Sequence, residues 1–220
     1  MSALIKLKEL TARIEGILAS YYGFEIELSA CDCLLAPEPD DRAGAPFGAL
    51  LVAQEDGLYV GLKFNQSTLE QAVVFDESEP YTPHRINALL VIIEEVSHFH
   101  LLTQRARSDL ATTQLELEWQ AEVDKLIILP ELVGESGGRV LLPGLRHFLV
   151  LGFKLRDGLS LEETMRYREA TRYLDLFWQK KLARPISRGM DFGMREPTVK
   201  ATLRKLYRLP WSAKTTIIAA

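Results

Sequence analysis

Cysteine is scarce in this sequence, whose 220 residues include only Cys31 and Cys33. A zinc site built from thiolates needs about four ligands, and the chain has no second pair of cysteines. Side chains at i and i+2 of a strand share one face, so a disulfide between these two would be strained. We therefore expect two reduced, structural thiols, as is usual in a cytoplasmic protein.

Long apolar runs are also missing. No run reaches the eighteen or so residues needed to span a bilayer. The N-terminal stretch MSALIKLKELTARIEG is amphipathic and lacks the charged region and apolar core of a signal peptide. Hydrophobic residues make up 47% of the chain and charged residues 25%, which is ordinary for a globular protein with a real core. We expect a cytoplasmic protein without a membrane partner.

The common catalytic signatures are absent as well. The chain contains no H-E-x-x-H, no G-x-x-x-x-G-K-[ST] and no G-x-G-x-x-G. One G-x-S-x-G match lies at residues 134–138, but a helical pattern precedes it and only His147 follows it. A nucleophile elbow needs a strand before it and an acid and a histidine later in the chain. We interpret the match as a loop.

The N-terminal part of the chain mixes helical and strand-like patterns. Residues 4–21 place apolar side chains at three- and four-residue steps, which predicts an amphipathic helix ended by Gly23. Residues 24–30, FEIELSA, alternate and predict a strand. Two further strand-like runs flank Asp56-Gly57, a dipeptide suited to tight turns, and predict an antiparallel hairpin near 48–64. Ser67 is expected to cap a short helix after the hairpin.

From residue 82 onward the pattern is helical. Two long helices are predicted at 83–108 and 113–129, the second ended by Pro130. The link between them is about four residues, which favours antiparallel neighbours. Thr113 and Ser160 begin capping boxes with Glu116 and Glu163, and further helical patterns cover 139–155 (broken near Gly144), 160–182, 198–208 and 212–219.

These patterns predict an α+β fold. An N-terminal helix with a small antiparallel sheet is expected in residues 1–81, followed by a mostly α-helical bundle in residues 82–220. A hairpin alone is unstable in water, so the sheet must lie against helices. We expect the two segments to pack as one unit.

The stretch VIIEEVSHFH, residues 91–100, carries the most chemistry. On a helical wheel, Glu94 and His98 fall on a polar stripe with Arg105, which predicts a solvated face. His100 falls among apolar residues, which predicts a core imidazole with one hydrogen bond. Glu95 and His98 form an E-x-x-H, but carboxylate-bridged two-metal bundles need that motif twice. It occurs once here, so a complete two-metal site cannot form.

The helix predicted at 113–129 is apolar on two sides, with Glu118, Glu122 and Lys125 in a narrow strip between them. We expect Glu122 to be buried and paired with Lys125, an arginine or a histidine of the preceding helix, and Glu122→Gln to cost more stability than Glu116→Gln. Salt bridges, an interface, and a metal or acid-base site are the alternatives. For a catalytic site the candidates are Glu95, His98, Glu118 and Glu122, and for a metal they are Glu95, His98 and Glu122. The favoured interpretation has no metal and no cofactor.

The end of the chain is basic although the whole is acidic. The formal net charge is −4, yet from residue 180 onward ten basic side chains stand against two acidic ones. Lys200, Arg204 and Arg208 follow at i, i+4 and i+8 on one face of a helix. This face could dock on the acidic body of the same chain, bind an acidic protein or bind nucleic acid. The overall acidity argues against a dedicated DNA-binding protein.

The opposed charges and the missing catalytic signatures favour a non-catalytic cytoplasmic interaction or accessory protein. Its acidic body and basic C-terminal region would mediate contact with an acidic protein surface or with a second copy of the chain. The alternative is a metal-dependent or acid-base enzyme with its carboxylate and histidine site between helices 83–108 and 113–129.

Overall fold

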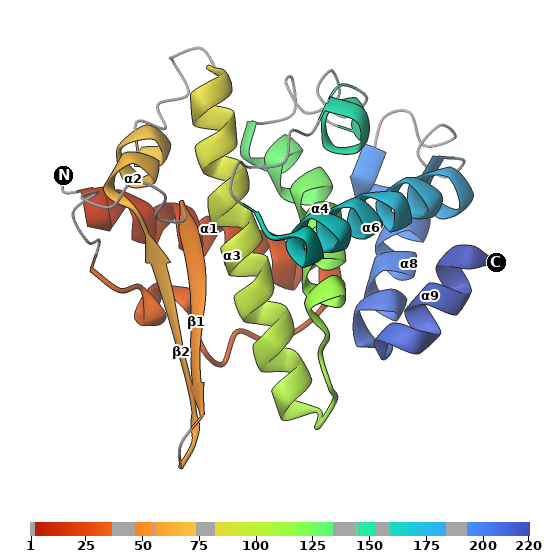
Figure 1. Cartoon of the computed structure of the whole chain (residues 1–220), viewed down its shortest axis with the longest axis horizontal. Coiled ribbons are helices and arrows are strands. Elements are labelled where there is room, and N and C mark those ends of the chain that lie inside the picture. Colours follow the sequence, from red (N-terminus) through yellow and green to blue (C-terminus); the bar gives the residue numbers. More distant parts are fainter. Residues whose placement is uncertain are drawn as a thin grey trace.

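The computed structural model describes residues 3–36, 47–54, 56–73, 82–133, 144, 146–152, 159–183 and 193–220. Over these ranges the fold is mostly helical, with one two-stranded antiparallel sheet, which confirms the α+β prediction. Figure 1 shows the sheet and the first helices on one side and the later helices on the other. The G-x-S-x-G match and much of the helix predicted at 139–155 lie outside the described residues.

The chain begins with helix α1 (Ala3–Tyr22), which ends at Gly23 with a φ of +70°. The predicted strand at 24–30 is wrong. Ser29 instead accepts a hydrogen bond from the Cys31 amide and starts a short 3-10 helix, η1 (Ala30–Cys33). The carboxylate of Glu15 accepts a hydrogen bond from the Ala30 amide at 2.6 Å. These two polar contacts satisfy the local backbone in place of strand pairing.

The predicted hairpin is confirmed. Strand β1 (Gly48–Gln54) pairs antiparallel with β2 (Leu58–Phe64), from Gly48 opposite Phe64 to Gln54 opposite Leu58. Helix α2 (Gln66–Val73) follows, but Ser67 is not its cap. Asn65 takes that place, because its side-chain oxygen accepts from the Thr68 amide at 2.8 Å.

Helices α3 (Pro83–Arg107) and α4 (Gln114–Val133) are the long central pair. They lie side by side and antiparallel, as predicted (Figure 1). Thr82 caps α3, because its hydroxyl oxygen accepts from the Arg85 amide at 3.3 Å. The prediction that Pro130 ends α4 is wrong, because the helix continues to Val133. The lost hydrogen bond is offset by burial of Leu129 and Leu132.

Helix α6 (Leu161–Phe177) begins at the predicted capping box, in which both hydrogen bonds between Ser160 and Glu163 are present. It packs across α4 and continues into a π-helical turn, η3 (Trp178–Leu182). A second π-helical turn, η2 (Phe148–Gly152), precedes α6. The 3-10 turn η4 (Gly193–Arg195) leads into α8 (Pro197–Arg208) and α9 (Trp211–Ala219), close to the two predicted helices.

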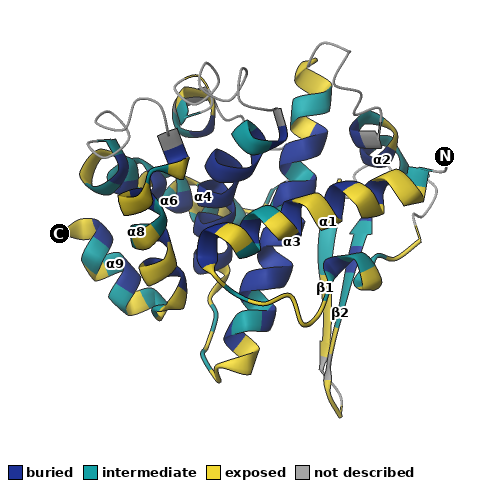
Figure 2. Ribbon diagram, turned by 180° about the vertical axis from the view of Figure 1, so that it is seen from behind, coloured by how far each residue is buried: buried dark blue, intermediate teal, exposed yellow. Residues whose placement is uncertain are grey.

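The core is centred on α3 and α4, which are dark along most of their length in Figure 2. By length and composition α3 would be apolar enough to cross a membrane, but 72% of its most apolar stretch is buried inside the protein. That is the setting of a core helix. The core also includes Leu7, Ile14 and Leu18 of α1 and Leu203 and Leu206 of α8, so it draws on both ends of the chain.

Candidate metal or acid-base site

Helix α4 buries an unusual number of ionisable groups. Trp119, Val123 and Leu126 fill its apolar sides. Its polar residues between 116 and 125 are nevertheless at most 4% exposed; they are Glu116, Glu118, Gln120, Glu122, Asp124 and Lys125. Burial of a charge is costly unless the charge is paired and hydrogen-bonded. Each of these side chains therefore has a partner, on a neighbouring helix or, for Glu122, on α4 itself.

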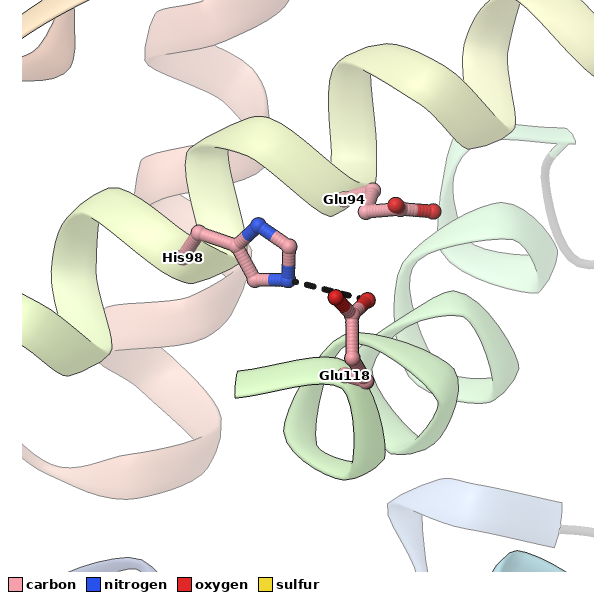
Figure 3. Close-up of side chains that lie close together, drawn as sticks. All are labelled: Glu94, His98 and Glu118. Carbon is pink, nitrogen blue, oxygen red and sulfur yellow. Dashed lines mark ion pairs between the residues drawn. The ribbon is translucent and has the colours of Figure 1, made fainter. Parts of the chain in front are cut away.

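Glu94 and His98 of α3 meet Glu118 of α4 in a group that we call the Glu–His–Glu cluster (Figure 3). One possible ligand atom from each residue lies within 4.8 Å of the others. The His98 Nε2 is 3.7 Å from the Glu118 Oε2. Glu94 and His98 come together because residues four apart share one face of a helix. The antiparallel packing of α4 adds the third side chain.

Cations surround the cluster on the Glu94 and Glu118 sides. The Lys125 Nζ lies 2.6 Å from Glu94 and 2.7 Å from Glu122. Arg166 of α6 brings its Nε to 3.4 Å from Glu118. The neighbouring Tyr167 donates its hydroxyl to Glu94 at 3.4 Å. Helix α6 thus closes the cluster from a third side.

The two ring nitrogens of His98 have different surroundings. The Nδ1 faces Glu95, whose Oε2 is 3.8 Å away. The Nε2 is buried, faces Glu118 and has no hydrogen-bond partner among the residues that the structure describes. A carboxylate behind one nitrogen is the usual arrangement for orienting an imidazole whose other nitrogen binds a metal. Glu95 in turn lies under β1, because a Cβ on Gly48 would be 2.9 Å from its Cγ.

The protonation of the cluster follows from these contacts. Burial would lower the pKa of His98, but the nearby carboxylates of Glu95, Glu118 and Glu94 raise it to about 9. Burial raises the pKa of Glu118 to about 7, against the opposing effects of His98 and Arg166. Lys125 outweighs burial at Glu94 and lowers the pKa of that carboxyl. His98 therefore carries a proton at neutral pH in the ion-free protein.

The local charges do not balance without such a proton. Four carboxylates meet here, from Glu94, Glu95, Glu118 and Glu122, whereas Lys125 and Arg166 are the permanent cations that contact them among the described residues. Two further positive charges are required for neutrality. Two protons, one of them on His98, would supply them, and so would one divalent cation bound to a neutral imidazole.

The structure confirms part of the predicted grouping of site residues and changes the rest. It brings His98 and Glu118 together as expected, while Glu95 faces the other ring nitrogen and Glu122 binds Lys125. The prediction of a buried, paired Glu122 is confirmed, since Glu122 is 4% exposed and its carboxylate lies 2.7 Å from the Lys125 Nζ.

The predicted solvated stripe is wrong. His98 and Arg105 are 9% and 3% exposed, because α4 packs against that face at both residues and the end of α8 adds to it at Arg105. Glu94 was therefore missed as a site residue, although its i, i+4 spacing from His98 was visible. No sequence signal pointed to Arg166 or Tyr167.

Other buried charges lie outside the cluster. Thr113 accepts from the Glu116 amide at 3.1 Å, as the predicted capping box requires, but the Glu116 carboxylate is fully buried between Arg105 at 2.7 Å and Lys214 at 2.8 Å. His100 has the predicted core position and bonds Glu15 at 2.9 Å. These contacts join α1, α3, α4 and α9.

The basic face of α8 contacts the same chain. Arg204 donates to the carbonyls of Ser20 and Tyr21 at 2.9 Å, at the C-terminal end of α1. The Lys200 Nζ lies 4.3 Å from the centre of the Tyr21 ring. Arg208 is exposed, and its backbone carbonyl accepts from Arg105. These contacts correspond to docking within the chain, and binding of a separate partner by these residues stays a prediction.

Comparisons with protein families, curated proteins and solved structures found no match for this chain.

Proposed function

We propose that the protein binds one divalent transition-metal ion between α3 and α4, through Glu94, His98 and Glu118. The observation that carries this proposal is the buried Nε2 of His98, which lies 3.7 Å from a Glu118 oxygen in a cluster with Glu94 and has no hydrogen-bond partner in the described chain. Imidazole and carboxylate together suit iron, manganese or zinc. This is the metal-dependent alternative from the sequence, with Glu94 and Glu118 in place of Glu95 and Glu122 as ligands.

The distances fit after a small movement. Ligand atoms about 2.1 Å from one ion lie at most about 4.2 Å apart, and the His98 and Glu118 atoms are 3.7 Å apart. Glu94 and His98 each have an outer partner that orients them. Lys125 and Tyr167 contact Glu94, and Glu95 faces the His98 Nδ1. Binding requires His98 to release its proton, because only the neutral imidazole is a ligand.

Elemental analysis of protein purified without chelator tests this proposal. We expect near-stoichiometric zinc, manganese or iron, and saturable uptake of the same ion by protein stripped with chelator. His98→Ala and the nearly isosteric Glu118→Gln should both lose the ion. His84→Ala is the matched control, because His84 is an exposed histidine of the same helix.

Two results would reject the metal. Wild-type protein that neither contains nor takes up any of the three ions shows that protons, not a metal, balance the cluster. Equal metal content in wild type and both cluster variants, with circular dichroism confirming that they are folded, places the ion elsewhere.

We also propose self-association through β1, which keeps the interaction hypothesis from the sequence. The hairpin projects beyond the helices in both whole-chain views (Figures 1 and 2). Leu51, Val52 and Tyr59 on it are 45%, 51% and 55% exposed. Strand β1 has no charged residue and pairs only with β2 among the described strands. Exposed, uncharged edge strands are templates for pairing with another chain.

A second copy suits this edge, because an antiparallel pair of identical strands needs only one surface on each partner. Sedimentation over a range of concentrations should show a dimer that Val52→Lys converts to monomer. Lys introduced at Met165, which is 61% exposed on α6, is the control and should leave the dimer intact. A monomer at all concentrations, or equal loss in both variants, rejects pairing through β1.

A further inference from the structure

Lys125 lies beside the Glu–His–Glu cluster and shares a carboxylate with it. The Lys125 Nζ lies between two side chains, 2.6 Å from a Glu94 oxygen and 2.7 Å from a Glu122 oxygen. The residue is 2% exposed, so its ammonium is removed from water. Glu94 also belongs to the Glu–His–Glu cluster, and its carboxylate therefore connects Lys125 with the proposed metal site.

The positive charge of Lys125 is permanent. Burial would lower the pKa of this ammonium, but the carboxylates of Glu122 and Glu94 raise it. A protonated amine has three donors and no lone pair, so Lys125 is not a metal ligand. It is a compact point charge between oxygen atoms of the kind that also bind metal ions.

Glu122 has an unused acceptor. Its Oε1 accepts a hydrogen bond from Lys125, whereas its Oε2 is buried and has no hydrogen-bond partner among the described residues. A carboxylate can accept about four contacts on its two oxygens, and an unsatisfied acceptor in the interior costs free energy. A divalent ion bound by both oxygens would satisfy it, which the ammonium on one oxygen does not.

The spacing of ionisable residues is the same on the two central helices. Lys125 follows Glu122 by three positions on α4, as His98 follows Glu95 on α3. Two-metal sites in helical bundles use a glutamate and a histidine at this spacing on each of two helices. Helix α4 has the glutamate, but a lysine takes the position of the histidine.

We infer that the Lys125 ammonium occupies the place of a second metal ion and limits the site to one ion. This inference rests on the proposed function for the first ion, at Glu94, His98 and Glu118. A pair of ions about 3.5–4 Å apart can hold both the attacking and the leaving oxygen of a displacement reaction. Lys125 excludes that class of reaction and leaves a single ion, which can polarise a carbonyl or activate one water molecule.

Replacement of Lys125 by histidine tests this inference. With the first ion bound, loss of the ammonium leaves one negative charge in excess among the four carboxylates, which favours a second cation. Lys125→His also supplies an imidazole, and histidine is shorter than lysine, which leaves room for an ion and its bond of about 2.0–2.1 Å to nitrogen. Elemental analysis after dialysis against zinc or manganese, and then against buffer, should give one ion per chain for wild type and two for the variant.

Two controls locate the added ion. Lys125→His combined with Glu122→Gln should return to the wild-type metal content, because an amide replaces the carboxylate that binds the second ion. Lys205→His, the same change on an exposed lysine of α8, should gain no ion.

The inference is wrong if Lys125→His contains no more metal than wild type, or if the added ion remains in the variant that also carries Glu122→Gln. It is also wrong if circular dichroism shows that Lys125→His stays unfolded with added metal, because the second ion should replace the charge of the ammonium. Wild type without an ion and Lys125→His with one would instead reject the site at His98, and Lys125 would still be the residue that prevents an ion from binding.

Discussion

Buried charges contribute to the stability of this protein, and Glu116 is the sharpest case, because its two buried cations reverse the expectation that Glu122→Gln would cost more stability than Glu116→Gln. Glu116→Gln leaves Arg105 and Lys214 buried together without their carboxylate. Removing one partner of a buried ion pair typically costs about 3–5 kcal/mol. Lys214→Met leaves a balanced pair of Arg105 and Glu116, so it should cost clearly less. Urea unfolding of the variants measures both values.

An exposed pair provides the control for Glu116. Glu169 and Arg172 are paired on the surface of α6, with side chains 40% and 53% exposed. Glu169→Gln should change the free energy of unfolding by about 0–1 kcal/mol. A loss at Glu116 no larger than the loss at Glu169 would contradict the role of the buried triad.

Asp124 should make stability depend on pH. Burial raises the pKa of this carboxyl from its ordinary 3.8 to about 6, although Ser97, Tyr22 and Gln120 donate hydrogen bonds to it. Between about pH 4 and 6 the folded protein keeps a proton that the unfolded chain releases. Stability from this group is therefore present at low pH and is lost as pH rises. Asn does not titrate, so the free energy of unfolding of wild type relative to that of Asp124→Asn should fall as pH rises from about 4 to 6. A difference that stays constant over this window would contradict the prediction.

Single residues also show which features the sequence alone cannot predict, namely which polar side chains are buried. The wheel placed His98 and Glu94 on a polar stripe, and their spacing as a pair was correct. Whether such a stripe faces water depends on α6, whose first residue lies more than sixty positions later in the chain. Glu116 fits a capping box by spacing, yet its carboxylate is buried in ion pairs with Arg105 and Lys214. Burial of polar groups is a tertiary property, so local periodicity cannot supply it.

At the scale of elements, two glycines predict opposite effects of the same change. A Cβ at Gly48 would lie 2.9 Å from side-chain atoms of both Glu95 and Val91, so Gly48→Ala must push β1 away from α3. We expect a loss of about 1–3 kcal/mol, as in overpacked cores. Gly16→Ala meets open space in the described chain and should gain roughly 0.5–1 kcal/mol. Thermal unfolding of both variants checks the signs, and two changes of one sign would contradict this packing.

Element types were mostly predictable, because amphipathic periodicity and caps are local. The hairpin, the two long helices and the Ser160 capping box all follow from short patterns. The failures have tertiary causes. FEIELSA alternates like a strand, but the chain there lies on Glu15 of α1. Pro130 lies within α4 because that helix end is buried in the core.

The whole molecule should unfold as one unit, although the sequence divides it at residue 82. Buried contacts join the two segments: Tyr22 hydrogen-bonds Asp124, Glu15 bonds His100, and Arg204 binds the end of α1. Unfolding either segment would leave buried polar groups of the other without these partners, which couples the two in free energy. Neither segment should therefore persist alone.

Two probes from different segments test this coupling. All three tryptophans lie beyond residue 82, so their fluorescence follows the helical bundle. Hydrogen exchange of the α1 amides over the same urea series follows the N-terminal segment. Coincident midpoints are expected, because a single core includes Leu7 and Ile14 of α1 together with Leu203 of α8. The α1 amides could instead lose protection at a lower urea concentration than the midpoint of the fluorescence change. The two segments would then be separate folding units, and the charge contacts between them would contribute little to the free energy of unfolding.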